Sequence, residues 1–257
     1  MSLTLSNLMS QIWPLALAAV VIGYFVIRGR HATQHRRIAA DAAQKKMDYA
    51  APASSSPDTF TDRDLHRFSG DTHGVAWTAE VLRLASEVDD GLVTRNVNSI
   101  NFTRWTATQC IADRGSLLLM NLPKGQPQAI AESKDTGGLL SAIRAKAGEM
   151  ALDLYVRQRF GAVRAKEWSV APSQRRVLED QVFGQCYGVW CDQTDLSTRL
   201  TAPVRDWLIK AHASGVALLW DRHGLTLHWS APRISPEEIA ACAEEGATLV
   251  GLLSQKS

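Results

Sequence analysis

Cysteine and histidine supply the side chains in this sequence that could hold a metal ion. Cys186 and Cys191 are followed by His212, His223 and His228. Zinc ligands converge at about 2.0–2.3 Å and usually come as Cys-x2-Cys or His-x3–5-His pairs. Here four residues separate the two cysteines, and residues five apart on a strand point to opposite faces. We therefore expect core thiols and ordinary histidines at these positions, and no metal site.

Carboxylates and one further thiol are the other side chains that could do chemistry. Asp89 with Asp90, and Asp192 with Asp195, lie beside turns or helix starts, where aspartate commonly caps a backbone N–H. Cys242 falls on the apolar face of the last predicted helix, where a thiol is a small, inert hydrophobe. Walker, GxGxxG, GxSxG and HExxH motifs are absent from the sequence. No catalytic residue and no cofactor is therefore predicted.

Tryptophan is unusually frequent, and aromatic side chains can stack on nucleic-acid bases. However, 28 basic and 26 acidic residues give a net charge of only +2, which offers no field to attract nucleic acid. Most tryptophans occupy apolar positions of predicted strands and helices. We expect core positions and no nucleic-acid partner for Trp77, Trp105, Trp168, Trp190, Trp207, Trp220 and Trp229.

An uncharged apolar run near the N-terminus predicts a transmembrane helix over residues 8–27. Twenty helical residues span about 30 Å, the thickness of a bilayer core. Trp13 and Pro14 lie near one end of the run and Tyr24 and Phe25 near the other, as expected for a membrane anchor with interfacial aromatic rings. A cleaved signal peptide would need basic residues before the run and a small-residue cleavage site after it. Neither is present, so we expect an uncleaved anchor.

Basic residues follow this run closely, and none precedes it. The positive-inside rule then predicts a single-pass membrane protein with residues 1–7 outside and residues 28–257 in the cytoplasm. Reduced cysteines fit that compartment. The same basic residues can contact anionic lipid head groups of the bilayer. This basic collar consists of Arg28, Arg30, Arg36, Arg37, Lys45 and Lys46.

The first half of the domain is predicted to be rich in strands. The helix of the anchor should continue to about Met47, and a linker rich in Pro, Ser and Ala should complete a juxtamembrane segment over residues 28–60. The folded domain is then expected over residues 61–257. From Gly74 to Leu84 apolar residues alternate with polar or small ones, which predicts a half-buried strand. Further strand and turn signals up to residue 122 favour an antiparallel meander.

The second half alternates helices with strands. Apolar spacing predicts a helix from residue 139 to 161, a strand over 167–170 and another near 184–191. Pro203 begins an amphipathic helix that ends at Gly215.

The C-terminal part contains the clearest local signals. Strands at 216–220 and 225–229 flank a turn and predict a hairpin. Ser235 and Glu238 form a capping box that opens the last helix, with proline at its first position. The fold class is therefore expected to be α+β, with a mainly antiparallel sheet covered by amphipathic helices.

Two stretches resemble a known group of sequences. Phe68 to Trp77, with the form Phe-x-Gly-x-x-x-Gly before a strand, and the tail from Tyr187 to Leu253 are similar to uncharacterised bacterial membrane-anchored proteins of unknown function. The resemblance implies an inner-membrane protein with one contiguous cytoplasmic α+β domain, and it carries over no catalytic residue. Together with the anchor, the collar and the linker, it predicts a membrane-tethered interaction or assembly module with membrane or cytoplasmic protein partners. The alternative is an enzyme of unrecognised type that acts on a membrane-associated substrate.

Overall fold

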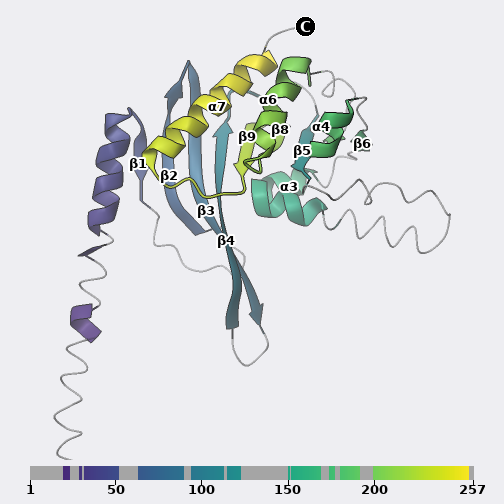
Figure 1. The fold of residues 1–257 in the computed structure, drawn as a ribbon. Helices are drawn as coiled ribbons and strands as arrows, with labels where there is room; N and C mark the ends of the chain where they lie inside the picture. The colour runs from purple at the N-terminus through teal and green to yellow at the C-terminus, as the bar shows by residue number, and fades with distance from the viewer. Residues whose placement is uncertain are drawn as a thin grey trace, which may run out of the picture.

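A computed structural model describes residues 20–23, 29–30, 32–51, 63–89, 94–112, 115–122, 150, 152–168, 174–176, 180–191 and 199–254. Within these residues the protein is an α+β domain built on one antiparallel sheet, with helices on both faces (Figure 1). The sheet has nine strands in the order β1-β2-β3-β4-β9-β8-β5-β7-β6. The strands are β1 (Asp48–Ala50), β2 (Arg63–Thr72), β3 (Val75–Asp89), β4 (Thr94–Ala107), β5 (Leu117–Asn121), β6 (Gln174–Arg176), β7 (Tyr187–Cys191), β8 (Ala217–Asp221) and β9 (Gly224–Trp229).

Two parts of this sheet follow directly from local sequence patterns. β3 and β4 pair antiparallel as the predicted meander requires, but its predicted third strand does not continue it, because β5 pairs with β7 and β8 and not with β4. β2 pairs with the other edge of β3. The predicted hairpin is confirmed as β8 and β9, whose turn is held by a hydrogen bond from the backbone N–H of His223 to Asp221 Oδ1 at 2.8 Å. β9 pairs with β4, so the C-terminal hairpin joins the meander to the remaining strands.

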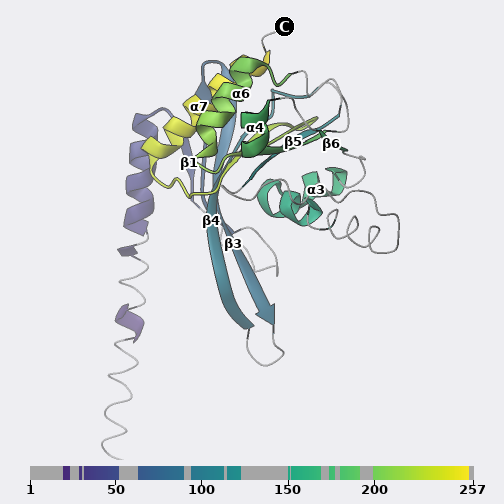
Figure 2. The same cartoon turned by 45° about the vertical axis from the view of Figure 1, so that its right-hand side comes forward.

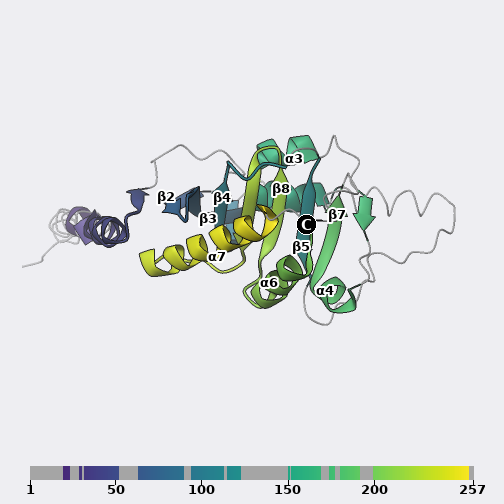
Figure 3. The ribbon, with the colours of Figure 1, turned by 90° about the horizontal axis from the view of Figure 1, so that it is seen from above.

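One face of the sheet is covered by α7 (Pro236–Ser254), α6 (Ala202–His212) and α4 (Gln181–Cys186), as Figure 3 shows. The alternation predicted along β3 is confirmed, because Trp77, Ala79 and Val81 all point to this face and are buried. They belong to the main hydrophobic core together with side chains from the three helices. Of the tryptophans predicted to lie in the core, Trp77, Trp105, Trp168, Trp220 and Trp229 are buried, and Trp190 and Trp207 are half-buried.

The predicted helix starts are also present. Glu238 Oε2 accepts the backbone N–H of Ser235 at 3.1 Å, and Ser235 Oγ accepts the backbone N–H of Glu238 at 3.2 Å. These two reciprocal hydrogen bonds are the predicted capping box at the start of α7. Pro203 lies in the first turn of α6, where it removes no helical hydrogen bond.

Gly246 lets α7 approach the sheet closely. A Cβ atom at this position would lie 2.7 Å from the ring of Trp105, which is fully buried. We expect Gly246→Ala to lower the free energy of unfolding by about 1–2 kcal/mol, because overpacking outweighs the higher helix propensity of alanine. Gly251 of the same helix has no atom within 4 Å of such a Cβ. Gly251→Ala should therefore raise stability by up to about 1 kcal/mol in urea denaturation, and equal effects at both positions would contradict the packing argument.

The opposite face carries the helix of residues 152–160 and α3 (Ala162–Trp168) (Figure 3). Val156, Phe160 and Trp168 form a second core cluster with side chains of β5 and β8. The strand predicted over 167–170 is contradicted at residues 167 and 168, which belong to α3, and residues 169 and 170 lie outside the described residues. Trp168 is buried in the second core cluster together with Ala165. Of the helix predicted from 139 to 161, residues 150 and 152–160 are helical, and the others lie outside the described residues.

Residues before the predicted start of the domain also belong to the fold. The helix of residues 32–44 lies beside β1, which pairs with β2 (Figure 1). Ala42 and Met47 are buried in the main core, and Ile38 packs against it. The folded part of the chain thus begins earlier than Thr61, and of the predicted linker only residues 50 and 51 are among the described residues.

The prediction of a transmembrane helix over residues 8–27 is contradicted. Among the residues that the structure describes, no helix has both the length and the apolar composition needed to cross a membrane. A span needs about 20 consecutive helical residues, whereas residues 20–23 are the part of this run that is described, and the rest lies outside the described residues. The single-pass inner-membrane localisation, with its cytoplasmic topology, depended on that helix and is contradicted as well. Contact with a lipid bilayer stays a prediction.

Candidate functional site

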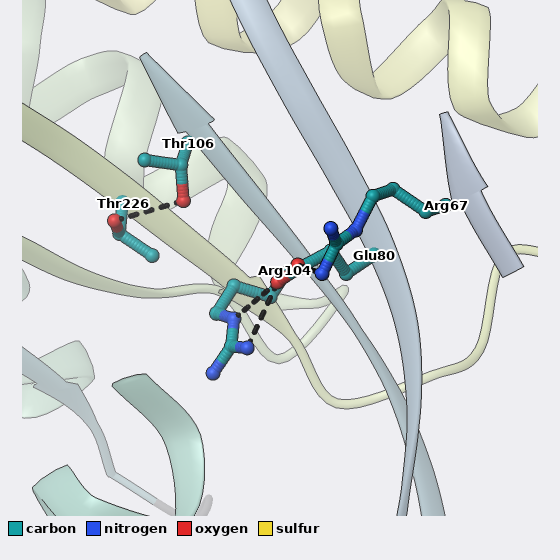
Figure 4. Close-up of polar contacts among 5 residues, drawn as sticks. All are labelled: Arg67, Glu80, Arg104, Thr106 and Thr226. Atoms are coloured by element: carbon teal, nitrogen blue, oxygen red, sulfur yellow. Dashed lines mark hydrogen bonds and ion pairs between the residues drawn. The ribbon is translucent and has the colours of Figure 1, made fainter. Parts of the chain in front are cut away.

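A row of polar side chains crosses the sheet on the face opposite α7. Strand register places Arg67 of β2 opposite Glu80 of β3, Glu80 opposite Arg104 of β4, and Arg104 opposite His228 of β9. Directly paired residues of antiparallel strands point to the same face, so the four side chains are neighbours across four strands. We call Arg67, Glu80, Arg104 and His228 the polar row (Figure 4 shows its first three members).

Glu80 is the centre of the polar row because it binds two arginines. Arg104 donates from Nε and Nη2 to Glu80 Oε2, at 3.0 and 2.8 Å. Arg67 Nη2 donates to Glu80 Oε1 at 2.7 Å (Figure 4). The side chains of Glu80 and Arg104 are only 16% and 15% exposed, whereas that of Arg67 is 51% exposed. Both carboxylate oxygens are thus engaged in charge-assisted hydrogen bonds, which suits this carboxylate to joining strands.

A second polar pair lies beside this network. The hydroxyl oxygens of Thr106 and Thr226 are 3.1 Å apart across β4 and β9 (Figure 4). Both residues lie two positions from the polar row, on the same face of their strands. Thr226 is 1% exposed, so the hydrogen bond satisfies a buried hydroxyl group. The polar surface therefore continues along β4 and β9 and does not end at the row.

His228 is the buried end of the polar row. Its side chain is packed against Phe102, with ring centroids 4.6 Å apart, and the residue is 1% exposed. Arg159 Nη1, from the helix of residues 152–160, lies 3.0 Å from Nδ1 and 3.3 Å from Nε2. Burial, and then the charges of Arg159 and Arg104, hold the pKa of His228 well below its usual range. The imidazole is therefore neutral at neutral pH and accepts a hydrogen bond from an arginine.

Arg159 connects the polar row to the helix that covers it. Its guanidinium carbon lies 4.9 Å from the ring centroid of Tyr155, and Nη1 also donates to Ser230 Oγ at 3.4 Å. Burial raises the pKa of Tyr155 to about 12, an effect that the nearby Arg159 charge partly opposes. This phenol therefore stays protonated and serves as a stacking surface for the guanidinium.

The polar row consists of structural ion pairs and a neutral imidazole. Glu80 is saturated by Arg67 and Arg104, and His228 is kept neutral between two arginines. General acid–base catalysis needs a group that exchanges a proton near the working pH, and the lowered pKa of His228 does not suit it to that role. The ion pairs of the row therefore join β2, β3 and β4 near the place where β3 and β4 leave the sheet.

The residues named from the sequence as candidate metal ligands are separated in the fold. Cys186 ends α4 and Cys191 ends the five-residue strand β7, so the length of that strand, roughly 16 Å, separates the two positions. His212 Nε2 lies 3.0 Å from the carbonyl oxygen of Leu122, and His228 belongs to the polar row. His223 lies in the β8–β9 turn. Across the described part of the chain, no three His, Cys, Asp or Glu side chains are grouped as metal ligands.

The remaining thiols and carboxylates have simple positions. Cys242 is buried in α7, and burial raises its pKa to about 12, so the thiol is protonated as the sequence indicated. Burial also raises the pKa of Cys110, to about 11. Asp89 ends β3, and Asp90, Asp192 and Asp195 lie outside the described residues.

The predicted anchor and basic collar are described only in part. Trp13, Pro14, Tyr24, Phe25 and Arg28 lie outside the described residues. Arg30, Arg36 and Arg37 are exposed. Lys45 Nζ forms an ion pair with Glu237 Oε1 of α7 at 3.3 Å, and Lys46 adopts a left-handed backbone (φ 59°) in the turn before β1. The Lys45 contact shows that one member of the collar helps to dock the N-terminal helix.

Sequence reasoning missed the polar row. Its signal was the polar half of the alternation along β3 and β4, where Glu80 and Arg104 alternate with buried residues. Such positions normally face water, so only the strand register shows that they meet. Comparison with known proteins adds nothing to this assignment, because no family model, no curated protein and no solved structure matches the chain. The resemblance to bacterial membrane-anchored proteins therefore stays a prediction.

Proposed function

We propose that this protein is an interaction module that binds an extended segment of a protein partner at a projecting β-ribbon. The ribbon consists of residues 84–89 of β3 and 94–100 of β4. Pairing of β2 with β3 ends at Arg83, and pairing of β9 with β4 begins at Thr103. Between these limits β3 and β4 pair with each other and extend beyond the sheet (Figures 1 and 2). This two-stranded projection is the observation that carries the proposal.

The energetics of a two-stranded ribbon support this proposal. An isolated pair of strands is at best marginally stable in water, and three or more strands are needed for independent stability. Each outer edge of such a ribbon presents unpaired backbone N–H and C=O groups, which a strand from another protein can pair with. Within the described residues no third strand pairs with this ribbon. A partner strand would complete it.

The polar row supports the ribbon at its base. Glu80 binds Arg104 three residues before β3 loses its pairing with β2 at Arg83, and Arg104 is next to Thr103, where pairing of β4 with β9 begins. A register shift between Ser86 and Glu87 leaves Val97 as an extra residue on β4. Such a bulge disrupts regular pairing on its strand. The edge of β3 is therefore the more regular template for an added strand.

Photo-crosslinking in the native host tests the proposal. A benzophenone amino acid at position 87 of the ribbon should give one discrete adduct that mass spectrometry can identify. The matched position is Thr248, an exposed residue of α7, which is not part of the ribbon. The same adducts from both positions, or none from position 87, would count against a ribbon interface.

Removal of the ribbon provides the second arm of this test. A variant with an Asn-Gly turn in place of residues 84–100 should keep the core, because the polar row and the pairing of β2 with β3 remain. We expect the partner found by crosslinking to lose at least about tenfold in affinity, since its backbone hydrogen bonds are lost. A shortened variant that melts cooperatively and still binds with unchanged affinity would contradict the proposal.

A further inference from the structure

A cluster of two histidines and a tyrosine joins the N-terminal helix to the sheet. His35 comes from the helix of residues 32–44, Tyr49 from the edge strand β1 and His66 from β2. Tyr49 Oη lies 2.6 Å from His35 Nδ1 and 2.9 Å from His66 Nδ1. The two imidazole centroids are 5.6 Å apart. Three separate elements thus meet at one hydroxyl group.

We propose that His35, Tyr49 and His66 form a pH-sensitive latch, which holds the helix of residues 32–44 on the sheet and releases it on acidification. This inference is independent of the ribbon interface. It concerns the opposite edge of the meander from β9 and rests on the geometry of the three side chains.

Proton counting explains how the latch works. A tyrosine hydroxyl has one proton, so it donates to one Nδ1 and accepts an Nδ1–H from the other ring. Two neutral imidazoles of opposite tautomer satisfy this arrangement, and so does one neutral and one protonated ring. A second proton leaves both rings as donors to one oxygen and places two positive charges 5.6 Å apart. Full protonation therefore opposes docking.

The surroundings of the latch make protonation of His66 in the docked state less favourable. His66 is 9% exposed, and Val81, which faces it from β3, is apolar. Phe68 lies beside it with a centroid distance of 6.4 Å. From the helix, Ile38 packs on the apolar core and His35 is the titratable group that faces the cluster. Desolvation by burial, and then the charge of His35, lower the pKa of His66.

The direction of the pH effect follows from this shift. A histidine whose pKa is lowered in the docked state binds fewer protons there than in the released state. Its contribution to docking is complete above the ordinary histidine pKa of about 6.5 and is lost as the pH falls below that value. Glu237, which pairs with Lys45 near the latch, is not a second acid-sensitive group in this range. Hydrogen bonds to the Glu237 backbone and to Lys45 lower the pKa of this carboxyl group.

Hydrogen exchange of the full chain tests the latch. Protection factors should be compared at about pH 7.5 and about pH 5.5, each corrected for the intrinsic exchange rate. We expect amides of residues 32–50 to lose on the order of tenfold in protection at the lower pH, the factor that two unit charges at this separation produce in a medium between protein and water. Amides of α7 should keep their protection.

Variants separate the latch from a general effect of acid. His66→Gln keeps a hydrogen-bonding partner for Tyr49 and should abolish the loss of protection. His35→Gln should reduce it, because His66 remains partly desolvated. His73→Gln removes an exposed histidine that pairs with Glu244 at 2.8 Å and should behave as the wild type.

Three outcomes would overturn the latch. One is equal protection of residues 32–50 in the wild type at both pH values, and another is the full loss retained in His66→Gln. The third is an equal loss in α7, which would indicate global unfolding. If His66→Gln fails to fold at the higher pH, the His35→Gln variant decides, and an unreduced loss there contradicts the proposal.

Discussion

Replacement of Glu80 by alanine should lower the free energy of unfolding by about 3 kcal/mol. The substitution leaves Arg104, whose side chain is 15% exposed, without the carboxylate that accepts from its Nε and Nη2. Removing one partner of a desolvated ion pair costs more than the pair contributes, because the remaining charge stays buried. Urea denaturation followed by tryptophan fluorescence measures the change.

Arg67→Ala is the matched control for this prediction. It removes the other arginine from the same carboxylate, but that side chain is 51% exposed. Exposed ion pairs contribute about 0–1 kcal/mol, so this variant should lose no more than that. If Arg67→Ala and Glu80→Ala are equally destabilising, the stabilisation does not come from the desolvated contact between Glu80 and Arg104.

Gly224→Ala, in the β8–β9 turn, should lower the free energy of unfolding by about 4 kcal/mol. The backbone of Gly224 has a φ of 111°, which residues with a Cβ rarely adopt. Its Cβ would also collide with the carbonyl oxygen of Ala107 and lie 2.7 Å from Thr108 Cα. Both contacts are with backbone atoms of β4 and the residue after it, so no side-chain rotation can relieve them.

Gly74→Ala provides the control, because it changes a glycine in the β2–β3 turn that also has a positive φ, of 77°. No atom lies within 4 Å of a Cβ built there. We expect about 1 kcal/mol from the backbone conformation alone. If the two substitutions cost the same in thermal or urea denaturation, then the close approach of the β8–β9 turn to β4 is not rigid.

Glu80 and Gly224 act on the same part of the sheet. Gly224 allows β9 to pair with β4 at Ala107, and Glu80 joins β4 to β3. Both contacts hold the strands from which the ribbon projects. A destabilised base should therefore weaken partner binding even when the ribbon sequence is unchanged, and the two variants can be used to test that dependence.

Local sequence signals predicted several elements correctly. The capping box of Ser235 and Glu238, the turn before Gly224 and the alternation through Trp77 each involve residues that are close in the sequence. Their energetic effect acts within one helix turn, one hairpin or one strand. Such signals hold wherever tertiary contacts do not oppose them.

Where tertiary contacts decided the outcome, the same kind of reasoning was wrong or incomplete. The predicted strand at 167–170 is helical up to Trp168, whose ring is buried against the sheet with Ala165. The transmembrane helix predicted over residues 8–27 was inferred from the length and composition of an apolar run. No such helix occurs among the described residues.

By itself, the sequence determined the α+β class, the antiparallel pair of β3 and β4, the C-terminal hairpin and the start of the last helix, because these depend on short-range periodicity and capping. Only the tertiary structure decided that Arg104 meets both Glu80 and His228, and that His35 and His66 share the hydroxyl of Tyr49. Alternation along a strand shows which residues share a face but not which strand lies beside it. The order of the strands depends on the packing of the whole core. This order brings together the residues of the polar row and those of the latch.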